Sequence, residues 1–166
     1  LFNVPVTNAQ VFTGNEAATR IAGTKRIVFD ESRKSVSFIE LDDHSNISES
    51  NSLTWLTQSL QLKSGESYQL SKTEKDPYGY VHYRYRQYYQ GIPVEYGVFY
   101  AHILKGRLVS ANGERYEQIS VATQPSISMQ DAHIKALEYF RPQQMLADQS
   151  IIEPTTLVVL PVKNKF

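Results

Sequence analysis

The sequence predicts an α+β fold, in which an antiparallel meander sheet carries one packed helix and is followed by a smaller unit of one helix and one strand. Residues 80–112 alternate in character along runs that are broken by tight turns, which is the pattern of strands joined by hairpins. Apolar residues recur at helical spacing in residues 53–60 and 129–140. A β-prone run, residues 156–162, comes last.

The composition narrows the possible classes of protein. The chain has 166 residues, no cysteine and a formal net charge of zero. This length suits one ordinary domain or two small ones. The absence of cysteine excludes disulfides, thiol catalysis and cysteine-ligated metals. The balanced charge gives no electrostatic support for nucleic-acid binding, and no apolar run approaches the ~20 residues that a membrane span needs.

Tyrosine is the unusual component, with eleven residues in the chain. Many of them lie between Tyr78 and Tyr100. A tyrosine buries its ring while its hydroxyl stays in water, so clustered tyrosines suit a half-exposed sheet or an interface. Both interpretations stay open at this point.

The N-terminal part predicts two short strands. Residues 1–23 show little periodicity. Residues 25–29 and 36–41 are apolar and β-branched, and the polar residues 31–34 form a turn between them. Residues 42–52 are rich in Asp, Ser and Asn and predict a polar loop.

A short helix and a strand follow this loop. Leu53, Leu56 and Leu60 fall on one helical stripe, and Ser52 is placed to cap the helix. Residues 68–73 then predict a strand. The helix is therefore expected to pack its leucine stripe on the sheet.

The meander is delimited by turn residues. Asp76 to Gly79 and Lys105-Gly106 predict tight turns, and Pro93 interrupts the ladder between two strands. In the first of these strands the apolar and aromatic side chains share one face and the basic ones share the other: Val81, Tyr83, Tyr85 and Tyr89 against His82, Arg84 and Arg86. Residues 94–104 are apolar on both faces, so we expect that strand inside the sheet.

The C-terminal part predicts a separate unit after a linker at residues 123–126. Ser128 and Asp131 resemble a capping box. The helix that follows carries its apolar side chains on one face: Met129, Ala132, Ala136, Leu137 and Phe140. We therefore divide the chain into residues 1–50, an N-terminal extension with strands, residues 51–122, the meander domain, and residues 123–166, the partial second unit.

No catalytic constellation is present in the sequence. No histidine is followed by glutamate, so the zinc-protease helix motif is missing, and no phosphate loop or nucleophile elbow occurs. His44, His82, His102 and His133 are far apart, and we interpret His102 and His133 as packed, structural residues. The sequence predicts that the chain is not an enzyme and holds no metal or cofactor.

The tyrosine surface is the candidate contact for another protein. Stacking of single-stranded nucleic acid is the alternative use of such a surface. It is disfavoured because the arginines point away from the tyrosine stripe and the chain has no basic excess. The exposed part of this surface is expected to make the contact, and the candidates are Tyr85, Tyr88, Tyr89 and Tyr96.

Residues 76–113 resemble the propeptide module (FTP) of the fungalysin/thermolysin family of zinc metalloproteases. The residues that carry the resemblance include Gln87, Gly91-Ile92-Pro93-Val94, His102 and Gly113, which we expect to be scaffold positions of the motif. Residues 125–162 resemble the start of a PepSY domain, which follows the first module in such proforms. The expected closing strands of that domain and the protease domain are absent from the sequence.

The resemblance implies a non-catalytic prodomain that assists the folding of a thermolysin-like zinc metalloprotease and inhibits it. The partner would be the catalytic domain, in cis or as a cleaved complex, and zinc and calcium are expected only there. The location would be secreted or extracytoplasmic. The alternative is a stand-alone PepSY/FTP-type protease-inhibitor or interaction module of the cell envelope.

Overall fold

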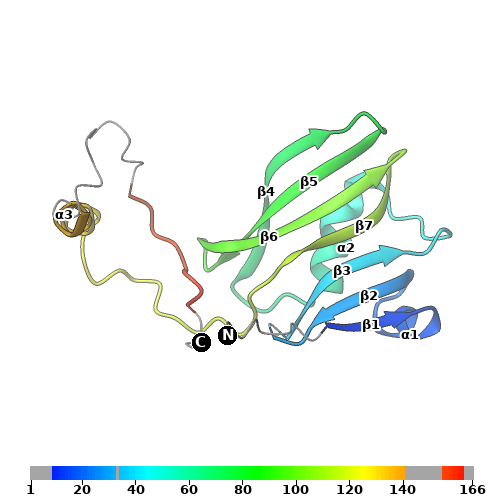
Figure 1. The fold of residues 1–166 in the computed structure, drawn as a ribbon, viewed down its shortest axis with the longest axis horizontal. Coiled ribbons are helices and arrows are strands. Elements are labelled where there is room, and N and C mark those ends of the chain that lie inside the picture. Colours follow the sequence, from blue (N-terminus) through cyan, green and yellow to red (C-terminus); the bar gives the residue numbers. More distant parts are fainter. Residues whose placement is uncertain (1–8, 33, 141–154, 163–166) are drawn as a thin grey trace, which may run out of the picture.

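The computed structural model of the protein describes residues 9–32, 34–140 and 155–162. Within these residues the chain forms a seven-stranded sheet, three α-helices and one 3-10 turn (Figure 1). The strands are β1 (Ala9–Thr13), β2 (Thr24–Asp30), β3 (Ser35–Leu41), β4 (Glu66–Lys75), β5 (Tyr80–Tyr89), β6 (Ile92–Leu104) and β7 (Arg107–Glu114). The helices are α1 (Asn15–Arg20), α2 (Ser52–Ser59) and α3 (Met129–Phe140).

The strand order β1-β2-β3-β7-β6-β5-β4 confirms the predicted α+β class with an antiparallel meander. Each neighbouring pair is antiparallel. β6 lies between β5 and β7, so the strand that is apolar on both faces is interior, as predicted. The N-terminal strands join the same sheet because β3 pairs with β7, with Ile39 opposite Ala111. The division of the chain at residues 50 and 122 stays a prediction.

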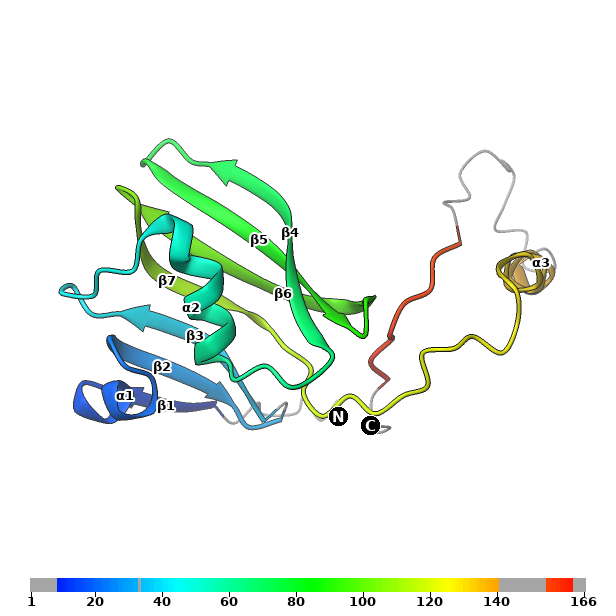
Figure 2. The same ribbon diagram turned by 180° about the vertical axis from the view of Figure 1, so that it is seen from behind.

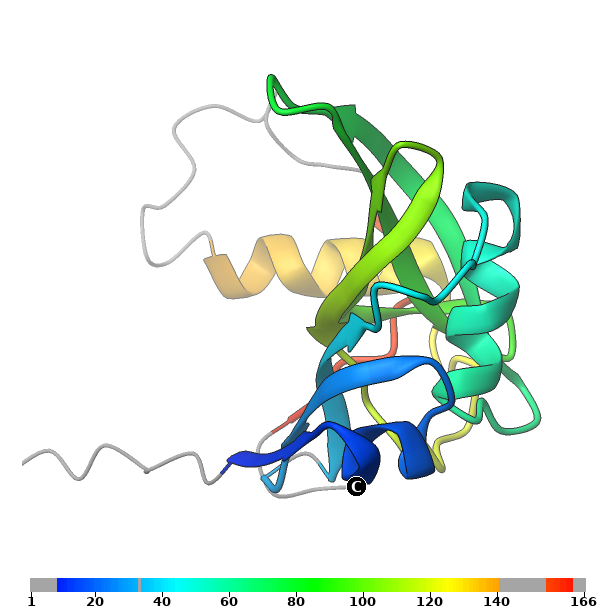
Figure 3. The same cartoon turned by 90° about the vertical axis from the view of Figure 1, so that its right-hand side faces the viewer.

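One face of the sheet is covered by α2, and the described residues place no helix over β5 and β6 on the other face, which we call the open face (Figures 2 and 3). The buried cluster under α2 includes Leu56, Tyr85, Phe99 and Ile103. Leu56, Phe99 and Ile103 are almost completely removed from water, which is how a short helix is stabilised by tertiary packing. The opposite face carries His82, Arg84 and Arg86 of β5, because side chains alternate along a strand.

Two sequence expectations are wrong, the cap of α2 and the C-terminal strand, and the N-terminal part holds two elements that no expectation covered. Residues 9–20, which show little periodicity, form β1 and α1. Ser52 does not cap α2, because its hydroxyl donates to the carbonyl of Glu49, 2.7 Å away, and a 3-10 turn (Glu49–Asn51) precedes the helix. Residues 156–162 form no strand, and among the described residues of this segment the pairing is a single parallel bridge to β6.

The predicted cap of α3 by Ser128 is confirmed, whereas the apolar face of this helix remains uncovered by the described residues. The Ser128 hydroxyl accepts the Asp131 N–H at 3.0 Å and donates to the Asp131 carboxylate at 2.8 Å. None of the described side chains of α3 is buried, and Met129 is 62% exposed. Figure 1 shows α3 set apart from the sheet.

Candidate protein-binding surface

A large bulge in β6 shapes the end of the sheet where the predicted contact residues lie. Arg86 of β5 pairs with Val98 of β6, and Tyr88, two residues later, pairs with Pro93. Residues 94–97 of β6 therefore lie opposite Gln87 alone. We call residues 94–97 the β6 bulge. Tyr96, within it, has φ 62°, a left-handed conformation that is uncommon for a residue with a side chain.

Gln87 is buried beside the β6 bulge, next to Gly97. Its side chain is 0% exposed. The Gln87 amide donates to the carbonyl of Tyr116 at 2.7 Å and accepts the N–H of Tyr116 at 3.0 Å, so its side chain satisfies the backbone of the chain after β7. A Cβ at Gly97 would lie 2.8 Å from Gln87 Cβ and Oε1, and only glycine fits this close approach.

The β6 bulge also forms backbone hydrogen bonds with Val159, in the segment at residues 155–162. The Val159 N–H donates to Pro93 O at 2.9 Å, and the Glu95 N–H donates to Val159 O at 2.8 Å. Val94, Ile119 and Val159 bury together in a second small apolar cluster. The segment at residues 155–162 is therefore anchored to the Ile-Pro-Val part of the sequence motif.

The predicted contact tyrosines separate into three environments. Tyr85 is 5% exposed and belongs to the core under α2, so the expectation that it contributes to an exposed surface is wrong. Its parity on β5 points it at the helix. Tyr88 is half-buried, and Tyr89 is half-buried against the second cluster. Tyr96 is 62% exposed on the β6 bulge.

Exposed apolar side chains continue from the bulge onto the anchored segment. Leu157 is 47% exposed and Leu160 is 52% exposed, on either side of the buried Val159. Because Val159 pairs with Val94, these side chains flank the strand that carries Tyr96. We call Tyr89, Tyr96, Leu157 and Leu160 the bulge surface. Tyr88 points to the opposite face of β5 from Tyr89, because neighbouring residues of a strand alternate.

Backbone contacts, backbone conformation and apolar packing account for several of the predicted scaffold residues. A Cβ at Gly113 would lie 2.1 Å from Val98 O and 2.6 Å from Phe99 Cα, so β6 and β7 touch at backbone level there. Gly91 has φ 81° in the β5–β6 turn. Ile92 lines the second apolar cluster, beside the Pro93 and Val94 positions described above.

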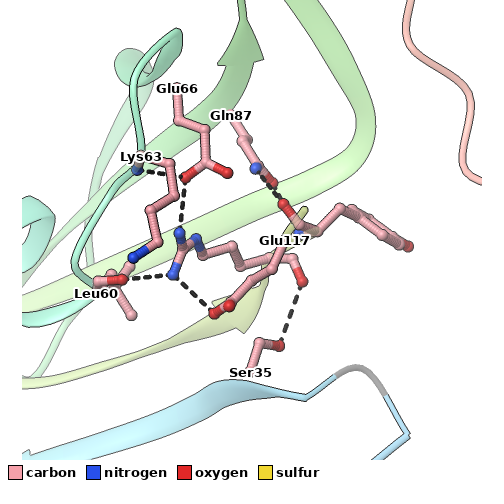
Figure 4. Close-up of polar contacts among 8 residues, drawn as sticks. Ser35, Leu60, Lys63, Glu66, Gln87 and Glu117 are labelled. Atoms are coloured by element: carbon pink, nitrogen blue, oxygen red, sulfur yellow. Dashed lines mark hydrogen bonds and ion pairs between the residues drawn. The ribbon is translucent and has the colours of Figure 1, made fainter. Parts of the chain in front are cut away.

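A buried ion-pair network, not anticipated from the sequence, braces the same end of the sheet (Figure 4). Arg115 and Glu66 are each 2% exposed in their side chains, and their N and O atoms are 2.7 Å apart. Arg115 also binds the Glu117 carboxylate at 2.8 Å and donates to the carbonyl of Leu60 at the end of α2. Ser35 donates to Arg115 O at 3.3 Å, so the network links β3, α2, β4 and the chain after β7.

One signal in the sequence could have identified Arg115, which follows β7 directly, as a buried charge. It shares strand parity with Ala111 and Gly113, which face the core side, so a charged residue stands at a core-facing position. What the parity alone cannot show is the partner, because Glu66 is far away in sequence. Removing the Arg115 charge would leave a buried carboxylate unpaired.

The open face carries a histidine pair. Nδ1 of His82 and Nδ1 of His102 are 2.7 Å apart on directly opposed positions of β5 and β6. His82 Nε2 lies 3.3 Å from an Asp76 carboxylate oxygen, and His102 Nε2 lies 2.5 Å from Asn112 Oδ1. His102 thus has a packed position within a polar chain of four side chains.

Asp76 is held in its ionised form. Burial opposes its ionisation, but the N–H groups of Tyr80 and Tyr78 and the ring of His82 outweigh this and lower the pKa of Asp76. Both N–H groups lie 2.9 Å from the same carboxylate oxygen. The carboxylate therefore closes the β4–β5 turn and presents its second oxygen to His82.

Two features are missing from the described part of the chain. Within residues 9–32, 34–140 and 155–162, no three His, Asp or Glu side chains are placed to hold a metal ion together. In the same ranges, no helix has both the length and the apolar character needed to cross a membrane.

Comparison with known proteins identifies one part of the chain. Residues 66–114 match the model of the Fungalysin/Thermolysin Propeptide Motif family. These bounds coincide with the start of β4 and the end of β7. The resemblance is therefore confirmed for the propeptide motif, while the PepSY interpretation of residues 123–166 stays a prediction. No curated protein matches the chain.

The solved structures that are similar to this chain include one that matches it over most of its length. It is the solution structure of cyanobacterial PsbP (CyanoP) from Synechocystis sp. PCC 6803, at 10% sequence identity and a TM-score of 0.36. The similarity covers 86% of this chain and 94% of that chain.

Proposed function

We propose that the chain is a non-catalytic prodomain of a thermolysin-like zinc metalloprotease, which it helps to fold and inhibits. The observation that carries this proposal is the propeptide motif match over β4–β7. Its support from the structure is that Gln87, Gly97 and Gly113 build one bulged, rigid sheet end from that motif. A rigid surface loses little conformational entropy on binding.

The bulge surface is the proposed contact with the catalytic domain. Aromatic residues are enriched at the centre of protein interfaces, and Tyr96 is the most exposed of the four predicted tyrosines. Binding to the native protease stabilises it by mass action, which accounts for folding assistance. Inhibition follows if the bound prodomain covers the cleft.

Zinc and calcium belong to the catalytic domain, the location is secreted or extracytoplasmic, and residues 123–166 begin a PepSY unit. The capping box of α3 and its uncovered apolar face support a unit that packs against further structure.

The first test is to read the coding region that follows Phe166. A continuous frame with a His-Glu-x-x-His motif and a downstream glutamate is the expected result. A stop codon soon after would contradict the prodomain proposal and leave the stand-alone module.

The second test measures binding to the catalytic domain found in that frame. The chain should inhibit its peptidase activity and raise its refolding yield after denaturation. Tyr96→Ala should weaken inhibition by roughly tenfold or more, as expected of an interface hot spot. The matched control is Tyr78→Ala, an 84% exposed tyrosine in the β4–β5 turn, which should inhibit like the wild type. Equal loss in both variants would contradict the contact assignment.

A further inference from the structure

The hydrogen bonds of the histidine pair fix the positions of the protons in its neutral state. The Asp76 carboxylate only accepts hydrogen bonds, so His82 carries its proton on Nε2 and has a lone pair on Nδ1. Since Nδ1 of His82 and Nδ1 of His102 are 2.7 Å apart, the proton between them belongs to His102. Nε2 of His102 then accepts an N–H from Asn112, whose amide can present either its NH2 group or its oxygen.

The pair also accommodates one additional proton. The added proton binds to Nε2 of His102, and the proton between the rings moves from Nδ1 of His102 to Nδ1 of His82. His102 is then neutral and donates from Nε2 to the amide oxygen of Asn112, 2.5 Å away. The positive charge lies on His82, which donates from Nε2 to the Asp76 carboxylate at 3.3 Å. All four ring nitrogens therefore keep their partners.

A second additional proton does not fit this geometry. Both Nδ1 atoms would then carry an N–H, and two donors cannot hydrogen-bond to each other at 2.7 Å. The two imidazolium rings would also repel, because their centroids are only 4.9 Å apart. We propose that His82 and His102 form a pH switch between β5 and β6, which is closed in the neutral and singly protonated states and opens when both rings are charged. This inference goes beyond the proposed prodomain function and is independent of it.

The charges around His82 favour the first protonation step. The Asp76 carboxylate is ionised and lies against the ring. Glu74 of β4 lies opposite His82 in the register and is paired with Lys72 at 2.7 Å. Arg84 is the next residue on the same face of β5, and it is the cation that opposes a charge on His82. Asp76 supplies the negative charge in direct contact with the ring.

The second proton meets no such compensation at His102. Glu40 of β3 lies in the same row of the sheet, beyond β7, and is already paired with Lys25 at 3.4 Å. The rings of Tyr80 and Tyr100, which lie parallel to those of the two histidines, add no negative charge. Among the described residues no carboxylate contacts His102. A charge on this ring is therefore opposed by its charged neighbour alone.

The switch links acidity to stability. In the unfolded chain the two histidines are independent, and both take up a proton below pH ~6.5. The folded pair resists the second proton, so the unfolded chain binds more protons in acid and the free energy of unfolding falls as the pH decreases. The pair lies near the β4–β5 turn, away from the β6 bulge, so opening should leave the bulge surface in place.

The test is ¹⁵N NMR of the histidine rings during a titration from pH ~8 to pH ~4. Scalar coupling across the hydrogen bond should connect Nδ1 of His82 with Nδ1 of His102 and should persist through the first protonation step. It should disappear in the second step, when all four ring nitrogens show the N–H signature. The matched control is His44→Gln, at an exposed loop histidine, which should leave the coupling and both steps unchanged.

Two variants test the assigned order of the steps. In Asp76→Asn the amide oxygen still accepts the N–H groups of the turn but carries no charge, so the first step should shift by about one pH unit towards acid. His102→Gln removes the second charge, so its denaturation midpoint should fall less than that of the wild type below pH ~6.5. Circular dichroism on each variant checks that the sheet is intact.

Any of three results would overturn the switch. The first is the absence of coupling between the two Nδ1 atoms at every pH in the folded wild type. The second is a doubly protonated pair whose cross-strand ring contacts persist in nuclear Overhauser spectra. The third is an acid loss of stability that is equal in the wild type and in His102→Gln.

Discussion

The meander β4–β7 and the segment at residues 155–162 have similar β-prone sequences but different structures. Every strand of the meander pairs along most of its length with a neighbour. The C-terminal segment makes one bridge, at Val159. β-propensity therefore describes a side chain that fits a sheet, and a strand forms only where a neighbouring backbone supplies hydrogen bonds.

The two longer helices show the same contrast. α2 buries Leu56 against the sheet, and Leu60 just after it is 4% exposed. α3 has a good N-terminal cap but no buried side chain among those described. A cap determines where a helix begins, whereas burial of an apolar face provides most of its stability.

The largest expected effect breaks the meander itself. Gly113→Ala places a Cβ against the β6 backbone, which cannot move aside as a side chain can, so we expect a loss of about 4 kcal/mol or no folded protein. Urea unfolding followed by tyrosine fluorescence measures it. Gly79→Ala is the control: its φ of 88° is strained for alanine but no atom lies within 4 Å, and it should lose only about 1 kcal/mol. Similar losses in both variants would show that the backbone contact is unimportant.

The next effect concerns the buried network that joins the meander to β3 and α2. Arg115→Met leaves Glu66 buried without its partner, and we expect a loss of about 3 kcal/mol in the free energy of unfolding. The double variant Arg115→Met/Glu66→Leu removes both charges and should recover at least half of that loss. Chemical denaturation of the three proteins measures the coupling, and purely additive effects would contradict it.

A smaller effect is expected when a substitution detaches the C-terminal segment from the meander. Val159→Asp places a charge in the second apolar cluster, so the segment should detach and the N–H of Glu95 should lose its protection from hydrogen exchange. Amides in the middle of β6 should keep theirs. Leu157→Asp, at a 47% exposed position, is the matched control and should leave the protection of Glu95 unchanged. Global unfolding of the Val159 variant would contradict the separation.

The smallest effect is a pH dependence at the edge of the core. Tyr83 donates to the Glu49 carboxylate, and this bond together with burial raises the pKa of Tyr83 to about 12. Since the pKa is higher in the folded protein than the ~10 of an unfolded tyrosine, the contribution to stability is complete below pH ~10 and is lost as the pH rises towards 12. Denaturation midpoints across this range measure it.

Tyr83→Phe should have a lower free energy of unfolding than the wild type at neutral pH. This difference should become smaller above pH ~10. Because the pair is partly exposed, we expect less than about 1 kcal/mol. Tyr78→Phe, which removes an exposed hydroxyl, is the control and should behave as the wild type throughout. A difference that widens above pH ~10 would contradict the assignment.

Much of the meander could be predicted from local signals, whereas part of the candidate surface could not. The turns at Gly79 and Gly106 and the alternation on β5 gave the strands in the correct order. Tyr85 was misplaced on the surface because alternation identifies two faces without saying which one a helix covers. The β6 bulge was missed because the register depends on Gln87 and Tyr116, which meet only in the fold.

The sequence by itself determined the class of fold, the β-hairpins of the meander, the α3 cap and the propeptide motif, because these depend on residues close together in the chain. The tertiary structure alone decided the joining of β3 to β7, the burial of Tyr85, the Arg115–Glu66 pair and the meeting of His82 with His102. Each of those depends on which strands become neighbours. That choice is made by the burial of apolar surface summed over the whole sheet, which no local pattern contains.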